Sequence, residues 1–344
     1  MIDLKSLTYE ELLEELLARS LPKFRAGQIY EWTHRKLVEG FDEMTNLSKD
    51  LREQCKQIFT FTTLKMVDRQ VSRFDGTEKY LFATEDGNMM ESVLMRYHHG
   101  NSVCISSQIG CRMGCRFCAS TLDGLTRNLT AAEMLDQIYR IQKMTGERVS
   151  NVVIMGTGEP MDNFDNVVRF IKLLSDERGL HISQRNITVS TCGLVPRMRQ
   201  LADLKLQITL ALSLHAATDE KRKTLMPIAN RYTIAQLMEA CGYYFEQTGR
   251  RLTFEYSLVK GVNDTKEDAE LLSKLARQVM SHVNLIPVNP IKERDYEQPD
   301  TKFVEAFKKR LEKNHVNVTI RREMGRDIDG ACGQLRKRHL DTER

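Results

Sequence analysis

Four of the chain's eight cysteines lie in one short polar segment, CISSQIGCRMGCRFCAS, at residues 104–120. Three of them, Cys111, Cys115 and Cys118, have the spacing C-x3-C-x2-C, and three thiolates on one loop can hold one metal centre. A structural zinc ion requires a fourth ligand, and the sequence has no second C-x2-C or H-x3-H pair. A [4Fe–4S] cluster held by three protein thiolates keeps one iron open for an outside ligand. The spacing therefore favours an open cluster, with an incomplete zinc site or buried structural thiols as the alternatives.

Other candidate site residues stand where predicted strands end. GTGEP, at 156–160, offers glycines that let a backbone approach a ligand closely, and the Glu159 carboxylate, which can accept hydrogen bonds from an ammonium group. The motif lacks the third glycine of a dinucleotide-binding fingerprint, so alone it is a weak signal. The other polar residues at strand ends are ordinary caps or turn residues when taken alone: Ser190, Ser213, His215 and Asn289.

The cysteine spacing, with the aromatic residue Phe117 before the last cysteine, resembles the radical S-adenosylmethionine (SAM) superfamily. In that superfamily SAM chelates the open iron of a [4Fe–4S] cluster, and an electron from the reduced cluster cleaves SAM to a 5′-deoxyadenosyl radical. The resemblance implies these two cofactors, which the protein positions. It also implies a SAM-binding set: Gly158, Glu159, Ser190, Ser213, Leu214, His215 and Asn289.

Nearly the whole chain is similar to the RlmN/Cfr family, whose members methylate adenosine in RNA. The matching segments are FRAGQIYEW, CISSQIGCRMGCRFCAS, GTGEP, STCGLVP, LSLHA, LMPIANRY, LVKGVND, HVNLIPVNP and DIDGACGQL. Adenine C2 and C8 are electron-poor, so an electrophilic methyl donor has the wrong polarity for them, whereas a carbon radical can add there. The resemblance therefore implies an RNA substrate and a radical methyl transfer.

Three further residues have catalytic roles by this resemblance. Cys332, in DGACGQ, accepts a methyl group from one SAM, loses a hydrogen atom to the radical made from a second SAM, and joins the base through its methylene carbon. Cys104 then attacks the Cys332 sulfur, which releases the product and leaves a disulfide that thiol exchange must reduce. Glu91 matches a carboxylate treated as a proton acceptor, and whether Glu91 or Cys104 takes the ring proton stays open. The remaining cysteines are expected to be small core residues: Cys55, Cys192 and Cys241.

The branch of the family that methylates adenine C2 is favoured over the Cfr-type branch, which methylates C8 and confers ribosomal antibiotic resistance. Pro160 follows Glu159 here, whereas the C8 enzymes tend to have alanine. The implied partners are 23S rRNA at the peptidyl transferase centre, tRNA with an adenosine 3′ of the anticodon, a low-potential electron donor such as flavodoxin or ferredoxin, and a thiol reductant. Two other classes stay open: a radical SAM enzyme acting on protein or small molecules, such as a glycyl-radical activase, and a zinc-stabilised RNA-binding module.

Sequence patterns indicate the elements that must position these residues. Residues 1–60 are expected to form short helices, with a capping box of Thr8 and Glu11 and an N-cap at Ser48. Residues 61–100 alternate between apolar and polar, with Asp-Gly turns at 75–76 and 86–87, which predicts an antiparallel β extension. We expect the first segment to be an RNA-binding accessory domain.

Residues 101–344 are expected to form the radical SAM core, because apolar strands alternate there with amphipathic helices. The predicted strands are 102–107, 151–156, 186–191, 207–215, 252–259, 283–289 and 317–322, and helices should begin after Thr130 and Thr265. Six or seven such units are too few for a closed eight-fold barrel. We therefore expect an α/β fold, an incomplete (β/α)6 TIM-like barrel, with its active groups at the carboxyl ends of the strands.

Composition narrows the setting of the protein. The 344 residues carry a net charge of +4, and no apolar run is long enough to span a membrane. No apolar signal region is present near the start, so a cytoplasmic location is expected, where stable disulfides are rare. Basic residues gather in 320–339 and in 21–36, the latter interleaved with Phe24, Tyr30 and Trp32. Both segments suit an RNA-binding surface, and equally a solvated helix face.

Overall fold

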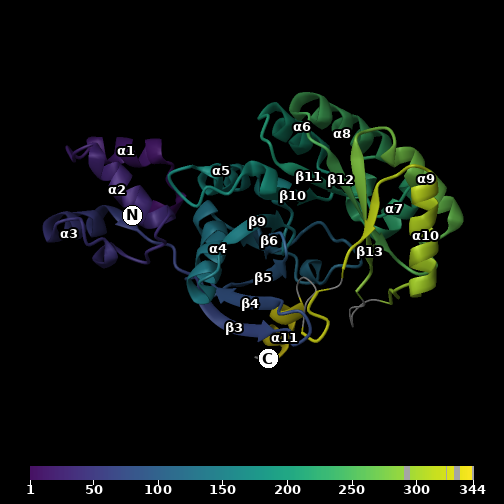
Figure 1. Ribbon diagram of the computed structural model, residues 1–344, viewed down its shortest axis with the longest axis horizontal. Coiled ribbons are helices and arrows are strands. Elements are labelled where there is room, and N and C mark those ends of the chain that lie inside the picture. Colours follow the sequence, from purple (N-terminus) through teal and green to yellow (C-terminus); the bar gives the residue numbers. More distant parts are fainter. Residues whose placement is uncertain (290–294, 323, 329–333, 343–344) are drawn as a thin grey trace.

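A curved ten-stranded sheet forms the centre of the computed structural model, and most helices lie around its outer side (Figure 1). The structure describes residues 1–289, 295–322, 324–328 and 334–342. The strand order is β14-β13-β12-β11-β10-β9-β6-β5-β4-β3. Along this order, the neighbouring strands from β14 to β6 pair in parallel, and those from β6 to β3 pair antiparallel. The two ends of the sheet are not paired with each other, which confirms the incomplete barrel.

The antiparallel part confirms the predicted β extension and its turns. Its strands are β3 (Lys65–Val71), β4 (Glu78–Ala83), β5 (Met89–Tyr97) and β6 (Gly100–Ile105). Gly76 and Gly87, the glycines of the two Asp-Gly pairs, have the positive φ angles that tight hairpin turns require. Since β6 also pairs with β9 in parallel, the extension continues the core sheet along one edge.

The parallel part alternates strands and helices as predicted. Its remaining strands are β9 (Val149–Ile154), β10 (Ile187–Thr191), β11 (Thr209–Ser213), β12 (Leu252–Leu258), β13 (Ser281–Pro287) and β14 (Val318–Ile320). Its helices are α4 (Ala131–Thr145), α5 (Phe164–Ser175), α6 (Val195–Asp203), α7 (Asp219–Leu225), α8 (Ile234–Thr248), α9 (Lys266–Ala276) and α10 (Thr301–Lys313). Thr130 and Thr265 cap α4 and α9, as expected from the sequence. A last helix, α11 (Gln334–Thr342), lies beside β5.

The N-terminal segment forms a small helical unit at one end of the sheet (Figure 1). It contains α1 (Tyr9–Leu17), α2 (Phe24–His34) and α3 (Lys49–Ile58), and the parallel pair β1 (Ile2–Asp3) and β2 (Phe59–Thr60). The capping box at Thr8 and the N-cap at Ser48 are confirmed. Short 3-10 helices occupy Leu4–Ser6, Phe41–Glu43, Ala119–Thr121, Pro160–Asn163, Gln184–Asn186 and Pro227–Asn230.

Polar contacts fasten this helical unit to α4. The Lys5 ammonium forms a fully buried ion pair with Asp136, whose second oxygen accepts a hydrogen bond from the Leu64 N–H. Nearby, His34 Nδ1 lies 2.8 Å from the Tyr139 hydroxyl.

Among the described helices, none is both long and apolar enough to cross a membrane.

Candidate functional site

The loop that carries the three closely spaced cysteines begins and ends on a two-stranded antiparallel ribbon, β7 (Gln108–Gly110) and β8 (Leu125–Asn128). The Cys111 N–H donates to the Gly124 carbonyl at 2.8 Å. Gly110 has φ +74°, and a Cβ atom there would lie 2.0 Å from the same carbonyl oxygen, so only glycine fits. This ribbon, which closes the loop at its base, was not predicted from the sequence.

All three loop cysteines line one cavity of about 250 Å³ at the carboxyl ends of the parallel strands. The same cavity is lined by most of the predicted SAM-binding residues: Gly158, Glu159, Ser190, Ser213, His215 and Asn289. The Ser190 and Ser213 hydroxyls, from neighbouring strands, are 3.2 Å apart. Leu214 is the exception. Its side chain is fully buried, its N–H donates to Glu255, and its carbonyl accepts from Arg222.

The turn after β9 explains why GTGEP has glycine at position 158. Gly158 has φ +112°, and a Cβ there would lie 2.6 Å from the Gln108 side chain, so the backbone packs directly against the ribbon. This contact places Glu159 at the cavity wall, where its carboxylate accepts hydrogen bonds from the Met161 and Cys192 N–H groups at 3.0 and 2.7 Å. Burial raises the pKa of Glu159, and an ammonium ligand would compensate that burial by pairing with the carboxylate.

The donor set fits a [4Fe–4S] cluster. Burial, together with the charges of Cys118, Glu159 and Asp162, raises the pKa of Cys111 to about 12. The pKa of Cys115 is raised by burial and by the other two cysteines, so three thiolates here need a cationic centre to balance their charge. Within the described residues, no three His, Cys, Asp or Glu side chains converge as a single-ion site. Cluster ligands need not converge, because each thiolate binds a different iron.

His215 belongs to the cavity wall as a neutral imidazole. Burial lowers its pKa to about 3, and its Nδ1 accepts a hydrogen bond from the Ser257 N–H at 2.9 Å. The Phe117 ring packs edge-on against the imidazole, with centroids 4.8 Å apart. The aromatic residue of the cysteine loop therefore orients a side chain from the end of β11.

Two charged residues near this cavity were not predicted from the sequence. Arg222, from α7, is fully buried and donates to the carbonyls of Cys192, Ser213 and Leu214, which joins the ends of β10 and β11. Within the described part of the chain its Nη1 has no hydrogen-bond partner. Glu255 lines the cavity from β12 and accepts from Asn284 at 2.9 Å. A lone acid in the apolar strand LTFEYSLV was the available signal for Glu255. No sequence signal pointed to Arg222, because its hydrogen-bond partners are distant in the sequence.

Cysteine 192, expected to be a core residue without a role, also lines this cavity. Burial raises its pKa, and Glu159 raises it further. Its N–H donates to Glu159 and its carbonyl accepts from Arg222, so its backbone links the two charged groups. Cys55 and Cys241 are buried in the core, as predicted.

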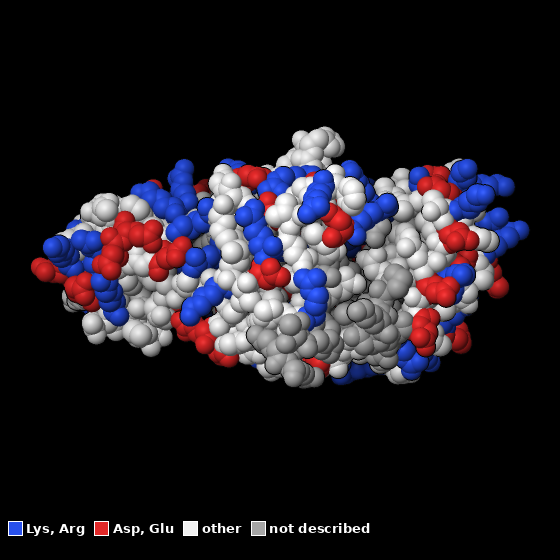
Figure 2. Space-filling view, turned by 90° about the horizontal axis from the view of Figure 1, so that it is seen from below, with Lys and Arg blue, Asp and Glu red and all other residues white. Residues whose placement is uncertain are grey.

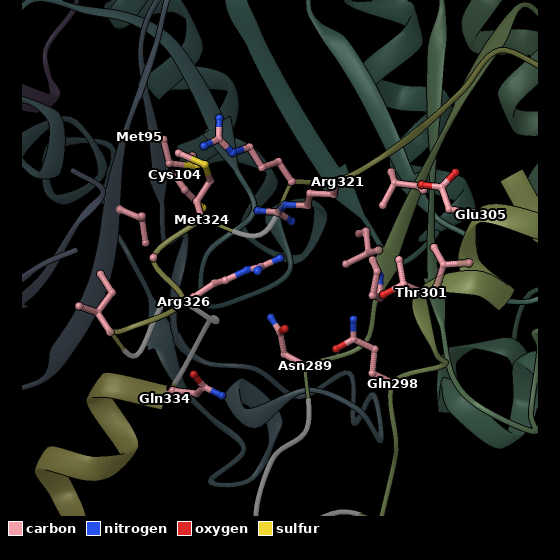
Figure 3. Close-up of a pocket in the computed structure, with 18 residues that line it drawn as sticks. Met95, Cys104, Asn289, Gln298, Thr301, Glu305, Arg321, Met324, Arg326 and Gln334 are labelled. Atoms are coloured by element: carbon pink, nitrogen blue, oxygen red, sulfur yellow. The ribbon is translucent and has the colours of Figure 1, made fainter. Parts of the chain in front are cut away.

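A second and larger cavity, of about 540 Å³, lies beside the first (Figure 3). Cys104 and Met95 form part of one wall, and Asn289 and Gln298 approach from the other side. Three arginines of the basic C-terminal segment also line it: Arg321, Arg322 and Arg326. Three residues line both cavities: Ile286, Asn289 and Arg321. The two cavities are therefore adjacent and share part of their walls.

Glu91 lies on β5, buried and close to this second cavity, but it is not among the residues that line it. Its carboxylate pairs with the Lys79 ammonium at 3.1 Å and accepts a hydrogen bond from the Arg336 N–H, in the first turn of α11, at 2.6 Å. Cys332, the third residue with an expected catalytic role, lies outside the described residues.

The aromatic and basic residues of 21–36 are divided between the surface and the core. Phe24 is exposed, with the Arg25 guanidinium 4.7 Å from its ring centroid, whereas Tyr30 is buried and donates to Asp176. His34 belongs to this basic segment, but it is neutral in the folded protein, because burial lowers its pKa to about 3. Figure 2 shows lysine and arginine side chains spread across the face it views, interspersed with acidic ones.

Comparisons with known proteins extend over both parts of the chain. Residues 105–273 match the model of the radical SAM superfamily, and residues 2–61 match that of the ribosomal RNA large subunit methyltransferase N-terminal domain. A protein of Lachnospira eligens named probable dual-specificity RNA methyltransferase RlmN is 65% identical over 341 residues, 99% of this chain and 97% of that protein. A protein of the same name from Clostridium novyi is 54% identical, covering 99% of both chains.

A solved structure agrees with these relatives. The crystal structure of a radical SAM methyltransferase from Sphaerobacter thermophilus is similar with a TM-score of 0.92 and 43% sequence identity. The similarity covers 97% of this chain and 99% of that one. The correspondence therefore includes the helical N-terminal unit as well as the sheet.

Proposed function

The chain belongs to the RlmN family of radical SAM RNA methyltransferases, and on that premise we propose that it methylates C2 of one adenosine in 23S rRNA, at the peptidyl transferase centre. We propose the adenosine 3′ of the anticodon in some tRNAs as a second substrate. As a radical SAM enzyme the chain uses a [4Fe–4S] cluster and SAM. These RNAs place the proposed activity in the cytoplasm.

The first cavity is the proposed cofactor site. Cys111, Cys115 and Cys118 would hold the cluster, Glu159 would accept the SAM ammonium, and the two strand-end hydroxyls would bind further polar groups of SAM. The remaining proposed SAM contacts are Gly158, Leu214, His215 and Asn289. When bound, the cofactors supply a 5′-deoxyadenosyl radical, which abstracts hydrogen atoms. The neutral His215 adds no positive charge beside the sulfonium of SAM.

The second cavity is the proposed site of the base. Cys332 would accept a methyl group on sulfur, give up one hydrogen atom from it and bond to adenine through the methylene carbon. After the ring proton has left, Cys104, which lines this cavity, would attack the Cys332 sulfur; the bond between that sulfur and the methylene carbon would break, the carbon would gain a proton, and the unpaired electron of the adduct would return to the oxidised cluster. The observation that carries this proposal is that Ile286, Asn289 and Arg321 line both cavities, so the two cavities are adjacent, as transfer of a carbon from SAM through Cys332 to a base requires.

We also propose how the RNA is held and which partners are needed. Three arginines line the cavity of Cys104, and arginine is suited to bind the phosphates that flank a flipped base. Residues 1–60 would bind RNA as an accessory domain, with the exposed Phe24 and its basic neighbours as the contact surface. Residues 61–100 would extend the core formed by 101–344. A low-potential electron donor such as flavodoxin or ferredoxin would reduce the cluster, and a thiol reductant would reopen the disulfide.

Nucleoside mass spectrometry tests the proposal. Anaerobically reconstituted protein is incubated with SAM, a reductant and protein-free 23S rRNA or tRNA, and the digested RNA is compared with 2-methyladenosine and 8-methyladenosine standards. We expect 2-methyladenosine. The C8 isomer would assign the chain to the other branch of the family, and no methyladenosine in either RNA would overturn the proposed substrate.

A further inference from the structure

The Glu91 carboxylate contacts a buried ammonium group and the backbone N–H of a helix. One carboxylate oxygen lies 3.1 Å from the Lys79 ammonium, and the other accepts the Arg336 N–H at 2.6 Å. Lys79 is fully buried and only 4% of the Glu91 side chain is exposed. Both oxygens of this buried carboxylate therefore contact protein groups.

The register of the sheet places Glu91 close to Cys104 without placing it in the same cavity. Val93 is opposite Cys104 across β5 and β6, and Glu91 lies two residues before Val93 on the same face of the sheet. Glu91 and Cys104 are therefore diagonal neighbours, with Cα atoms about 7–8 Å apart. Cys104 lines the larger cavity and Glu91 does not.

The group that Glu91 binds on the far side is the start of a helix. Arg336 is the third residue of α11, and N–H groups in the first turn of a helix have no partner within the helix. A carboxylate there satisfies one of these donors and is favoured by the helix dipole. Gln334, the first residue of α11, lines the cavity of Cys104 (Figure 3). Glu91 thus fixes the helix to β5 at the edge of that cavity.

Cys332 is four residues before Arg336 in the sequence. A chain of four residues spans at most about 14 Å, so the sequence itself links Cys332 closely to the start of α11. We propose that Glu91 is a positioning residue that fixes the start of α11 to β5, and that this anchor limits the positions that Cys332, four residues earlier in the sequence, can take during the reaction. The ring proton then goes to a group that lines the cavity, with Cys104 the proposed acceptor. This inference rests on the proposed function.

Three variants distinguish a positioning role of Glu91 from a role as the base that takes the ring proton: Glu91→Ala, Glu91→Gln, and the double variant Lys79→Met/Glu91→Gln. Glutamine keeps an oxygen that can accept the Arg336 N–H, and the double variant removes the buried ammonium charge together with the carboxylate charge. Each reconstituted protein is given SAM without RNA, and methylation of Cys332 is measured by peptide mass spectrometry. This step involves no ring proton, so a base is not needed for it.

For an anchor, we expect Glu91→Ala to lose at least tenfold in the rate of Cys332 methylation, and the double variant to recover most of it. Hydrogen exchange of the α11 amides should rise in Glu91→Ala and stay near the wild-type rate in the double variant. If all variants methylate Cys332 at the wild-type rate and then accumulate protein–RNA adduct, Glu91 is the base and the inference is wrong. Wild-type protein without Cys332 methylation would overturn the proposed function, while the exchange rates would still test the anchor.

Discussion

Cys118 shows at the residue scale what the three-cysteine loop is for. Its side chain shares the smaller cavity with Cys111 and Cys115, and the charges of the three thiols act on one another. Loss of one thiolate leaves two, too few to retain a cluster with a single open iron. Cys241, in contrast, is buried in the core and does not line this cavity.

We expect Cys118→Ala to abolish cluster assembly and RNA methylation together. Iron content and the visible absorption of the reconstituted protein measure the first, and nucleoside analysis measures the second. Cys241→Ala is the matched control, and it should cost about 1 kcal/mol of stability through a small cavity while retaining iron. A Cys118→Ala protein that keeps its full iron content would contradict the assigned ligand set.

Arg222 places a buried positive charge next to the cofactor site. It lies within electrostatic range of Cys115 and Cys192, and its three acceptors are strand-end carbonyls. A buried cation stabilises the more negative, reduced form of a nearby cluster. Its hydrogen bond to the Ser213 carbonyl also keeps Ser213 at the edge of the cavity. A substitution of Arg222 therefore changes both the charge beside the site and the position of Ser213.

We expect Arg222→Met to lower the midpoint potential of the cluster, because on the order of 1–2 kcal/mol of electrostatic stabilisation is lost. Arg222→Lys keeps the charge but not the three hydrogen bonds, so it should restore much of the potential while SAM still binds more weakly. A redox titration monitored by electron paramagnetic resonance measures the potential. Equal potentials in wild type and Arg222→Met would show that the arginine is only structural.

At the scale of elements, α2 is attached to α4 through a histidine that must stay neutral. Burial lowers the pKa of His34 to about 3, and its ring nitrogen bonds to Tyr139. The unfolded chain takes up this proton near pH 6.5, whereas the folded chain does so only near pH 3. Stability from this site is therefore complete above pH 6.5 and is lost as the pH falls toward 3.

We expect His34→Gln to reduce the pH dependence of the free energy of unfolding by up to about 1.4 kcal/mol per pH unit between pH 6 and pH 4. Urea unfolding of both proteins at several pH values measures the difference, in which the common contribution of carboxylates cancels. His98→Gln, at an exposed site, should leave the slope unchanged. Identical slopes in wild type and His34→Gln would mean that His34 takes up its proton at the same pH in the folded and unfolded chain, which would contradict this explanation.

The elements also show what could be predicted from the sequence. Capping boxes and Asp-Gly turns are local, so α1, α4 and the hairpins of β3–β5 were expected correctly. Predicted strands agree with the structure to within two residues at most boundaries. The β7–β8 ribbon was missed because its strands of three and four residues are too short to show a period, and a bulge interrupts them.

At the scale of the whole molecule, two cavities are formed by segments far apart in the sequence. Strand ends from β9 to β13 meet the cysteine loop in one of them, and the C-terminal segment meets Cys104 in the other. Motifs identified most of these residues. Their division between two cavities, and the side chains shared by both, depend on sheet curvature and packing, which no motif contains. Arg222 and the Glu91–Arg336 contact belong to the same class of long-range features.

The adduct formed by Cys104→Ala protein tests the whole account most directly, because it requires the cofactors, the RNA and both cysteines to act in order. The variant is incubated with SAM, reductant and substrate RNA, and the products are separated under denaturing conditions. We predict a protein–RNA adduct, joined through Cys332, that accumulates in the variant and is transient in the wild type. Release of methylated RNA at the wild-type rate, or SAM cleavage with no adduct at all, would contradict the account.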